Sequence, residues 1–199
     1  MNHSKLFAAL ALAAAFTTQA ADPEAGQAKS ATCAACHGLT GTSANPIWPS
    51  LAGQHESYLV QQLQAYQNGT RSDPMMTAMA MGLSEQDMQD IAAFYSRQTP
   101  PTQTAEPILV DVGQALYRGG NMETGVPACI ACHGAEGAGN PAAGWPRVAG
   151  QHAEYTAKQL TAYRDGSRAT DSMSMMRDIA KRMSDEEIVA VANYLQGLR

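Results

Sequence analysis

The four cysteines of the chain fall into two short motifs of identical pattern. Cys33 and Cys36 are followed at once by His37, and Cys129 and Cys132 are followed by His133. Cys-x-x-Cys-His is the attachment pattern of a c-type haem, in which two thiols bond the porphyrin and the imidazole binds the iron from one side. The sequence therefore predicts two covalently bound haem c groups, with the four cysteines as attachment points and the two histidines as axial iron ligands.

A Cys-x-x-Cys pair alone has two other interpretations, a thioredoxin-like redox pair and part of a zinc site. A thioredoxin-like pair needs a strand-to-helix setting, and the residues around both motifs show no strand pattern. A zinc site could use both pairs, but it gives no reason for a histidine at the same offset each time. The recurring histidine favours haem.

The first twenty residues resemble a secretory signal peptide. Lys5 gives a basic start, residues 6–16 form an apolar run too short to span a bilayer, and Thr18-Gln19-Ala20 offers small residues for cleavage after Ala20. No later segment is long and apolar enough to cross a membrane. We therefore expect export to the periplasm, where bacteria attach haem covalently, and no transmembrane segment. Peripheral association with a membrane stays open.

The two haem motifs lie in two copies of one domain. Short stretches recur at a period near one hundred residues, which indicates a duplication rather than a solenoid. The matched stretches include Gly26-Gln27-Ala28 with Gly113-Gln114-Ala115, Trp48-Pro49 with Trp145-Pro146, Gly53-Gln54-His55 with Gly150-Gln151-His152, and Gly69-Thr70-Arg71 with Gly166-Ser167-Arg168. The proline-rich residues 97–107 indicate a stiff linker. We expect a signal peptide over residues 1–20, domains over 21–96 and 108–199, and a linker over 97–107.

We expect an all-α fold in which each domain encloses one haem. Apolar spacing and capping residues predict helices over residues 23–35, 56–68, 84–97, 110–118 and 154–165 and from residue 184 onward. The methionine-rich stretch 71–83 should be mostly loop, because it contains Pro74 and Gly82. Domains this small bury a limited core, so the porphyrin would also add apolar mass.

Both halves are acidic. Residues 21–99 contain seven acidic and three basic residues, a net charge of −4, and residues 100–199 contain eleven and nine, a net charge of −2. Nucleic-acid binding needs a basic face. We therefore expect no nucleic-acid partner.

Each iron needs a second axial ligand, and methionine is the leading candidate among the 11 in the chain. A thioether ligand raises the reduction potential, whereas an open or exchangeable site permits catalysis. When Ser84 is aligned with Ser184, two methionine pairs coincide, Met75 with Met175 and Met76 with Met176. We favour Met76 and Met176, although this spacing alone leaves both pairs open.

His55 and His152 also repeat and are alternative ligands. Each lies 18 or 19 residues after its motif histidine and near a helix start, so a surface or helix-terminus role is the simpler interpretation. Pro49 and Pro146 follow their motif histidines by 12 and 13 residues. Their carbonyls are candidates to accept the free ring N–H, because metal-binding histidines are usually held in this way.

Three arginines have two open interpretations. They could neutralise haem propionates or lie exposed in solvent. They are Arg71, Arg168 and Arg177.

The chain resembles the cytochrome c4 family, bacterial di-haem cytochromes built from two class I cytochrome c domains. The resemblance covers essentially the whole mature chain. It rests on the two Cys-x-x-Cys-His motifs, Gly150-Gln151-His152, residues 155–160, Met76-Thr77-Ala78-Met79, Met176-Arg177 and residues 83–87. It implies Met76 and Met176 as axial ligands, and domains that face each other with the haem propionates at their interface.

The resemblance also implies a respiratory-chain carrier. Its redox partners would be a quinol–cytochrome c oxidoreductase, the quinol-oxidising complex, and a terminal oxidase. We therefore expect an electron-transfer protein and not an enzyme. The alternatives are a di-haem peroxidase or a thiosulfate-oxidising cytochrome, which would need one iron with a labile or unusual ligand, and a cytochrome subunit of a dehydrogenase.

Overall fold

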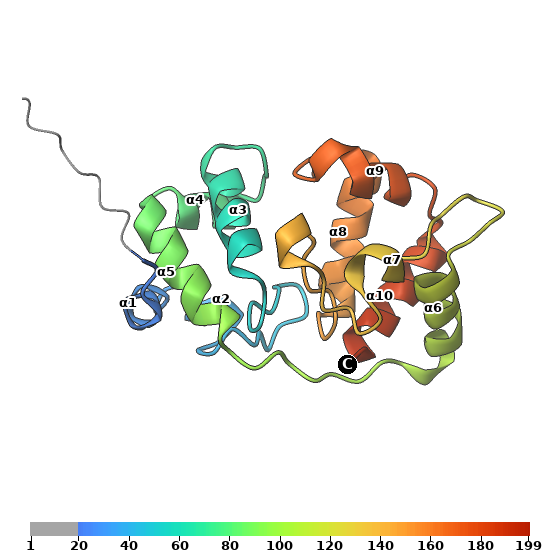
Figure 1. Cartoon of the computed structure of the whole chain (residues 1–199), viewed down its shortest axis with the longest axis horizontal. Helices are drawn as coiled ribbons and strands as arrows, with labels where there is room; N and C mark the ends of the chain where they lie inside the picture. Colours follow the sequence, from blue (N-terminus) through green and yellow to red (C-terminus); the bar gives the residue numbers. More distant parts are fainter. Residues whose placement is uncertain (1–19) are drawn as a thin grey trace, which may run out of the picture.

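The structure, a computed structural model, describes residues 20–199, and its regular elements in this range are helices. Two isolated β-bridges, Asn121–Val126 and Asn140–Trp145, are the strand-like pairings found there. The helices form two groups that lie side by side and are joined by one extended segment (Figure 1). The predicted all-α class is confirmed. Apart from Ala20, the predicted signal peptide lies outside the described residues.

The first group contains α1 (Pro23–Lys29), α2 (Ala34–His37), α3 (Glu56–Gln67), α4 (Pro74–Ala80) and α5 (Glu85–Ser96). Helix α5 is central, because α1 and α3 both pack against it, and α4 packs on α3. Apolar side chains of α3 and α5 form the core; these are Leu59, Ile91, Ala92, Phe94 and Tyr95.

The second group repeats this scheme. It contains α6 (Pro107–Gly119), α7 (Ile130–His133), α8 (Ala153–Asp165), α9 (Met175–Ala180) and α10 (Asp185–Gly197), with short 3-10 turns at Pro141–Ala143 and Ser172–Ser174. Helix α10 takes the central place, with α6 and α8 packed against it and α9 packed on α8. Its core includes Leu116, Tyr117, Ile188, Val191 and Leu195.

Two secondary-structure predictions are wrong. The helix predicted over residues 23–35 ends at Lys29, where the Ser30 hydroxyl bonds back to Gln27 O at 2.9 Å and a turn separates α1 from α2. Such a side-chain bond competes with continuation of the helix. The stretch 71–83, predicted to be mostly loop, contains α4. Pro74 stands in the first turn of α4, where its missing N–H has no cost, and Asp73 caps the helix.

In each domain the opening helix crosses the last helix at a glycine. A Cβ on Gly26 of α1 would lie 1.9 Å from Asp90 O of α5, and a Cβ on Gly113 of α6 would lie 2.2 Å from Ala190 O of α10. The missing side chain therefore lets the two backbones approach closely. This contact explains why a glycine recurs at the matched position of both halves.

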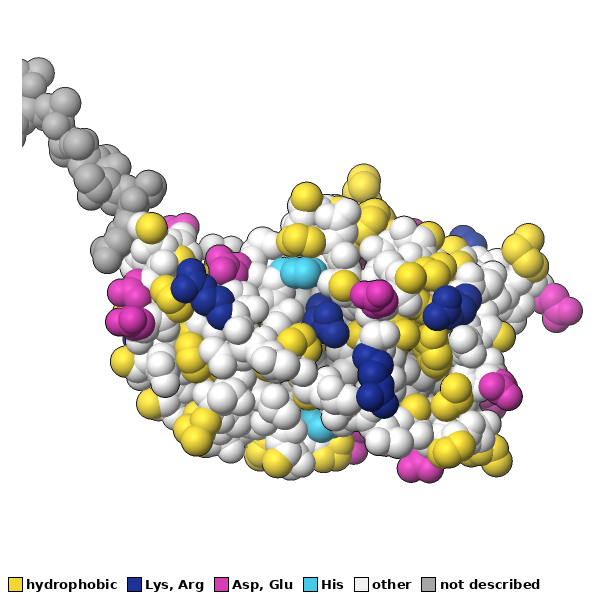
Figure 2. Space-filling view, turned by 60° about the horizontal axis from the view of Figure 1, so that its bottom comes forward, with side chains coloured by type: hydrophobic (Ala, Val, Ile, Leu, Met, Phe, Trp, Pro, Cys, Tyr) yellow, Lys and Arg dark blue, Asp and Glu magenta, His cyan; other side chains and the backbone are white. Residues whose placement is uncertain are grey.

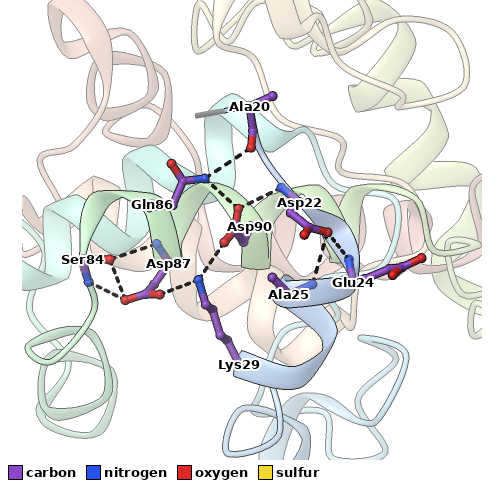
Figure 3. A network of polar contacts seen from close by, with 9 residues as sticks. All are labelled: Ala20, Asp22, Glu24, Ala25, Lys29, Ser84, Gln86, Asp87 and Asp90. Carbon is purple, nitrogen blue, oxygen red and sulfur yellow. Dashed lines mark hydrogen bonds and ion pairs between the residues drawn. The ribbon is translucent and has the colours of Figure 1, made fainter. Parts of the chain in front are cut away.

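A polar cluster fastens α1 to α5 (Figure 3). The buried carboxylate of Asp90 accepts the backbone N–H of Asp22 at 2.8 Å and pairs with Lys29 Nζ at 2.7 Å. Lys29 also pairs with Asp87 at 2.7 Å, and Asp87 forms a capping box with Ser84 at the start of α5. The Asp22 N–H and the Lys29 ammonium hold the pKa of Asp90 below its usual range.

The lowered pKa of Asp90 should make stability depend on pH. Such a carboxyl stabilises the fold above its unfolded pKa, about 3.9, and this contribution is lost as the pH falls through the folded value. We expect the free energy of unfolding to fall below about pH 4. Asp90→Asn should be less stable by about 1 kcal/mol at neutral pH, with a smaller loss in acid. Chemical denaturation followed by circular dichroism measures both.

The matched control for this prediction is Asp111→Asn, a carboxylate exposed on α6 of the other domain. It should leave stability and its pH dependence unchanged. The same acid-induced loss in the Asp90→Asn variant and in the natural protein would contradict the prediction.

The segment between α5 and α6 lies against both domains (Figure 1). A Cβ on Gly53 of the first domain would meet Pro100 at 2.3 Å. In the second domain, Gln103 Nε2 donates to Gly150 O and Gln196 Nε2 donates to Thr104 O, both at 2.7 Å. The linker is therefore packed along the molecule and is not a free tether.

Charge is spread over the surface. On the face drawn in Figure 2, lysine and arginine side chains are scattered singly, and acidic side chains are most numerous toward the two ends of the molecule.

Among the helices of residues 20–199, none combines the length and the apolar character that crossing a bilayer requires.

Candidate haem sites

Each Cys-x-x-Cys-His motif forms one helical turn. Cys33 caps α2 and Cys129 caps α7, and the motif histidine is the last residue of each helix. The N–H of His37 donates to Cys33 O, and that of His133 donates to Cys129 O, both at 2.9 Å. Residues three and four apart in a helical turn share one face. The two thiols and the imidazole of each motif therefore lie on the same side.

The four cysteines are free and partly buried. Burial raises the pKa of the Cys33 thiol and raises that of Cys129 to about 11. Within residues 20–199, no group of three or more His, Cys, Asp or Glu side chains converges on a site for a metal ion. The alternative of one zinc site shared by the two cysteine pairs therefore does not fit this structure.

The two motif histidines are held in the same way. Nδ1 of His37 lies 2.8 Å from the carbonyl oxygen of Pro49, and Nδ1 of His133 lies 3.0 Å from that of Pro146. A carbonyl oxygen can only accept, so Nδ1 carries the proton and Nε2 keeps its lone pair. Burial lowers the pKa of both imidazoles, which favours their neutral form. Each histidine can therefore bind a metal through Nε2.

The candidate methionines lie on α4 and α9. Met75 is 54% exposed, whereas Met76 is partly buried. Asp73 fixes the start of α4 by accepting the N–H groups of both residues at 3.1 Å. In the second domain Met175 and Met176 are both partly buried. Exposure therefore separates the two candidates in the first domain and not in the second.

The loop before α9 is built differently from the loop before α4. Asp171 accepts the backbone N–H of Arg177 at 3.0 Å and its Nε–H at 2.8 Å. Met173 and Ser174 have positive φ angles of 51° and 60°. Left-handed backbone is uncommon for residues other than glycine. The Asp171 carboxylate closes this turn by accepting both bonds from Arg177. Arg177 is thus engaged by a carboxylate of its own domain.

The alternative ligands His55 and His152 stand at the N-caps of α3 and α8. Nε2 of His55 lies 2.9 Å from Ala138 O, and Nε2 of His152 lies 2.9 Å from Ser43 O. Each histidine therefore bonds the backbone of the other domain. The structure gives both a part in the contact between domains, which the interpretation as surface or helix-terminus residues did not include.

Two glutamines join the domains reciprocally. The Gln54 side chain accepts from Arg147 N at 2.9 Å and donates to Arg147 O at 2.8 Å. The Gln151 side chain makes the same pair of bonds with Ser50, both at 2.9 Å. Ser50 and Arg147 directly follow the prolines that bond the motif histidines. The domain contact therefore holds the two loops that orient the histidines.

The interdomain role of these glutamines is not predicted from the sequence, although Gly-Gln-His recurs in both halves. A repeat shows that a residue is retained in both copies of a domain, but it does not show that the two copies bond each other.

Comparison with known proteins shows the family of the chain. The family model for cytochrome c matches residues 23–97 and 110–199. Cytochrome c4 of Thiocapsa roseopersicina is 50% identical over 182 residues, which cover 90% of this chain and 94% of the relative. The chain belongs to the cytochrome c4 family.

Solved structures and more distant relatives add detail. The crystal structure of reduced recombinant cytochrome c4 from Pseudomonas stutzeri matches this cytochrome c4 with a TM-score of 0.88 at 46% identity and covers 90% of this chain and 100% of that one. A thiosulfate dehydrogenase electron acceptor of Thiomonas intermedia is 38% identical and covers 94% of this chain and 85% of the relative.

As a cytochrome c4, the chain carries two covalently bound haem c groups, one in each domain, and is an electron carrier. The residues fit that cofactor. Each domain offers a pair of free thiols and a neutral imidazole whose Nε2 is unprotonated, all on one helical turn.

Proposed function

We propose that this cytochrome c4 works in the periplasm and passes electrons from a quinol-oxidising cytochrome complex to a terminal oxidase. His37 with Met76 and His133 with Met176 are the axial pairs. The proposal is supported by the likeness of the two sites, because the motif histidine is oriented by a proline carbonyl in both domains. Two equivalent sites suit a relay better than a division into one catalytic and one carrier centre.

The bound haem supplies one-electron chemistry through its ferric and ferrous iron. The protein's part is to keep the ligand set constant. Pro49 and Pro146 hold the two imidazoles through their Nδ1 atoms, and Met76 of α4 and Met176 of α9 would hold the iron with their thioethers. Met76 is favoured over Met75 because Met75 is more than half exposed. A methionine ligand raises the reduction potential and closes the sixth site.

The contact between the domains supports a relay. Gln54 and Gln151 each clamp the backbone that follows a histidine-bonding proline in the other domain. Movement of one domain against the other would break these bonds and disturb both histidines. The contact would therefore keep the two motif histidines at a constant separation and orientation.

A second candidate role is that of electron acceptor for a thiosulfate dehydrogenase. It is favoured by the relative of that name from Thiomonas intermedia, which is 38% identical to this chain. Both roles use the same carrier chemistry and differ in the donor. Reduction rates with a purified quinol-oxidising complex and with a thiosulfate dehydrogenase would separate them, and the proposal requires the faster reduction by the quinol-oxidising complex.

Carbon monoxide and peroxide test the carrier role itself. We expect the oxidised protein to show the weak far-red absorption band of an iron–thioether bond. The reduced protein should not bind carbon monoxide, and the oxidised protein should not react with peroxide, because both iron sites are closed. Rapid binding of carbon monoxide at one haem would instead favour a peroxidase or a thiosulfate-oxidising enzyme.

A further inference from the structure

Two buried arginines meet at the contact between the domains. Arg71 donates through Nη1 to Gln62 Oε1 at 2.8 Å and through Nη2 to Gln159 Oε1 at 2.8 Å. Arg168 donates to the same two oxygens, through Nη1 to Gln159 and through Nη2 to Gln62, both at 2.9 Å. Since each glutamine oxygen bonds both arginines, the two guanidinium groups lie close together.

The surroundings of this pair follow the same reciprocal pattern. Arg71 Nη2 donates to Tyr155 OH at 2.9 Å, and Arg168 Nη2 donates to Tyr58 OH at 2.8 Å. Each guanidinium also stacks on a tyrosine of its own domain, Arg71 at 4.7 Å from the centroid of Tyr66 and Arg168 at 4.6 Å from that of Tyr163. Every one of these partners is uncharged.

No carboxylate of residues 20–199 forms a salt bridge with either arginine. Arg71 is 6% exposed and Arg168 is 5% exposed, so water screens them little. The carboxylate that lies near in sequence, Asp73, accepts backbone N–H groups of α4. Two like charges buried together without an anion are unfavourable. A negative charge from outside the polypeptide would therefore stabilise the pair.

Burial raises the pKa of Tyr66 and Tyr163 despite the arginines stacked on them, whereas the Tyr155 phenol behaves differently. Burial by itself would raise the pKa of the Tyr155 phenol, but Arg71 and Arg168 outweigh burial and leave that pKa below its ordinary value. The Tyr155 phenol therefore lies where the positive charge of the two arginines dominates.

We propose that Arg71 and Arg168 form one shared binding site for haem propionates of both domains. The charge of this shared site would set the reduction potentials of both haems together. Each arginine directly precedes the segment that leads to its domain's candidate axial methionine, since Arg71 comes before α4 and Arg168 before α9. Each arginine also contacts the other domain through a tyrosine and a glutamine. The covalently held haem is the anion that every mature molecule contains.

The consequence is a coupling that a site within one domain would not produce. A positive charge near an iron disfavours its ferric state and so raises its reduction potential. Because the two guanidinium groups share acceptors across the interface, removing either one should affect both irons. Arg71 and Arg168 are positioning residues in this scheme, and neither ligates the metal.

The test is the reduction potential of each haem in Arg71→Gln and Arg168→Gln, measured by titration with the ring-methyl NMR signals followed separately. We expect each variant to lower both potentials, by about tenfold in the reduction equilibrium constant, which is about 59 mV for one electron. Arg71→Lys, which keeps the charge, should leave both potentials close to those of the natural protein. Arg97→Gln, the same charge change at an exposed residue of the first domain, should shift neither haem by more than about twofold, roughly 18 mV.

A change of potential confined to the haem of the substituted domain would contradict the shared binding site. Unchanged potentials of both haems would contradict it as well. Titrations in phosphate and in chloride at one ionic strength distinguish the source of the anion. Potentials that follow the phosphate concentration would show a solution anion in place of propionate and overturn the assignment.

Gln62→Glu provides an answer if the arginine variants do not fold. It puts a carboxylate where both guanidinium groups donate. If propionates already balance the pair, the added charge lowers both potentials and does not raise the unfolding temperature. A marked rise in unfolding temperature would show that the pair had no anion and would overturn the proposal.

This inference rests on the proposed axial ligation and not on the identity of the donor or the oxidase. A natural protein without the far-red band would contradict the ligation before any arginine variant is made, so the two failures are distinguishable.

Discussion

Changing Met76 to alanine should abolish the far-red iron–thioether band of one haem, while changing Met75 to alanine should leave the band intact. The thioether is the sulfur that closes the sixth site and raises the potential. Its removal leaves an exchangeable position, so the variant should bind carbon monoxide at that haem. Its potential should fall by more than tenfold in equilibrium constant, which is more than about 59 mV.

Met75 is a matched control because it is the neighbouring residue of the same helix, and its N–H is held by the same carboxylate, that of Asp73. The exposed fraction of its side chain is 54%, so its loss should cost little. Met176→Ala and Met175→Ala form the corresponding pair in the second domain. Loss of the band in Met75→Ala, with Met76→Ala unchanged, would exchange the two assignments. An unchanged band in all four variants would exclude methionine ligation by this pair of helices.

Changing Gly113 to alanine should destabilise the second domain by about 2–3 kcal/mol. A Cβ at this position would lie 2.2 Å from Ala190 O and 2.6 Å from Tyr194 Cβ. These atoms are a backbone oxygen and a Cβ, whose positions are fixed by the backbone, so a change of rotamer cannot relieve the clash. Helix α6 would have to move away from α10 and expose part of the core. Chemical denaturation of the holoprotein, followed by circular dichroism, measures the loss.

Gly119→Ala is the control in the same helix. A Cβ at Gly119 would meet no atom within 4 Å, and its φ is not positive. Alanine there should leave stability unchanged or raise it by up to about 1 kcal/mol, because it restricts the unfolded chain. Equal stability of the two variants would show that α6 and α10 do not depend on the close backbone contact.

The positions of the main helices could be predicted well, because they depend on local patterns in the sequence. Apolar spacing and the Ser84 and Ser184 caps place α5 and α10, and both caps are completed three residues later, by Asp87 and Glu187. Helix α4 is not predicted by these patterns, because Pro74 resembles a helix breaker in the sequence. In the first turn of a helix capped by Asp73, however, the missing N–H of proline loses no hydrogen bond.

The burial of Arg71 and Arg168 could not be predicted from the sequence. The sequence left two interpretations, propionate binding and solvent exposure. The structure excludes solvent exposure, because both side chains are more than nine-tenths buried. Their burial arises from the other domain, whose tyrosine and glutamine side chains cover them. Nothing in the residues near Arg71 indicates that Tyr155 and Gln159 will lie against it, because those residues are more than eighty positions away.

The sequence alone determined the number of haem motifs and the helical class, since both depend on residue types at short, regular spacing. It also determined the duplication, since matched stretches recur in both halves. The tertiary structure decided which proline carbonyl orients each histidine, how Gln54 and Gln151 join the domains, and why two arginines lie buried side by side. These features depend on contacts between segments distant in the chain, and a contact of that kind exists only once the two domains have packed together.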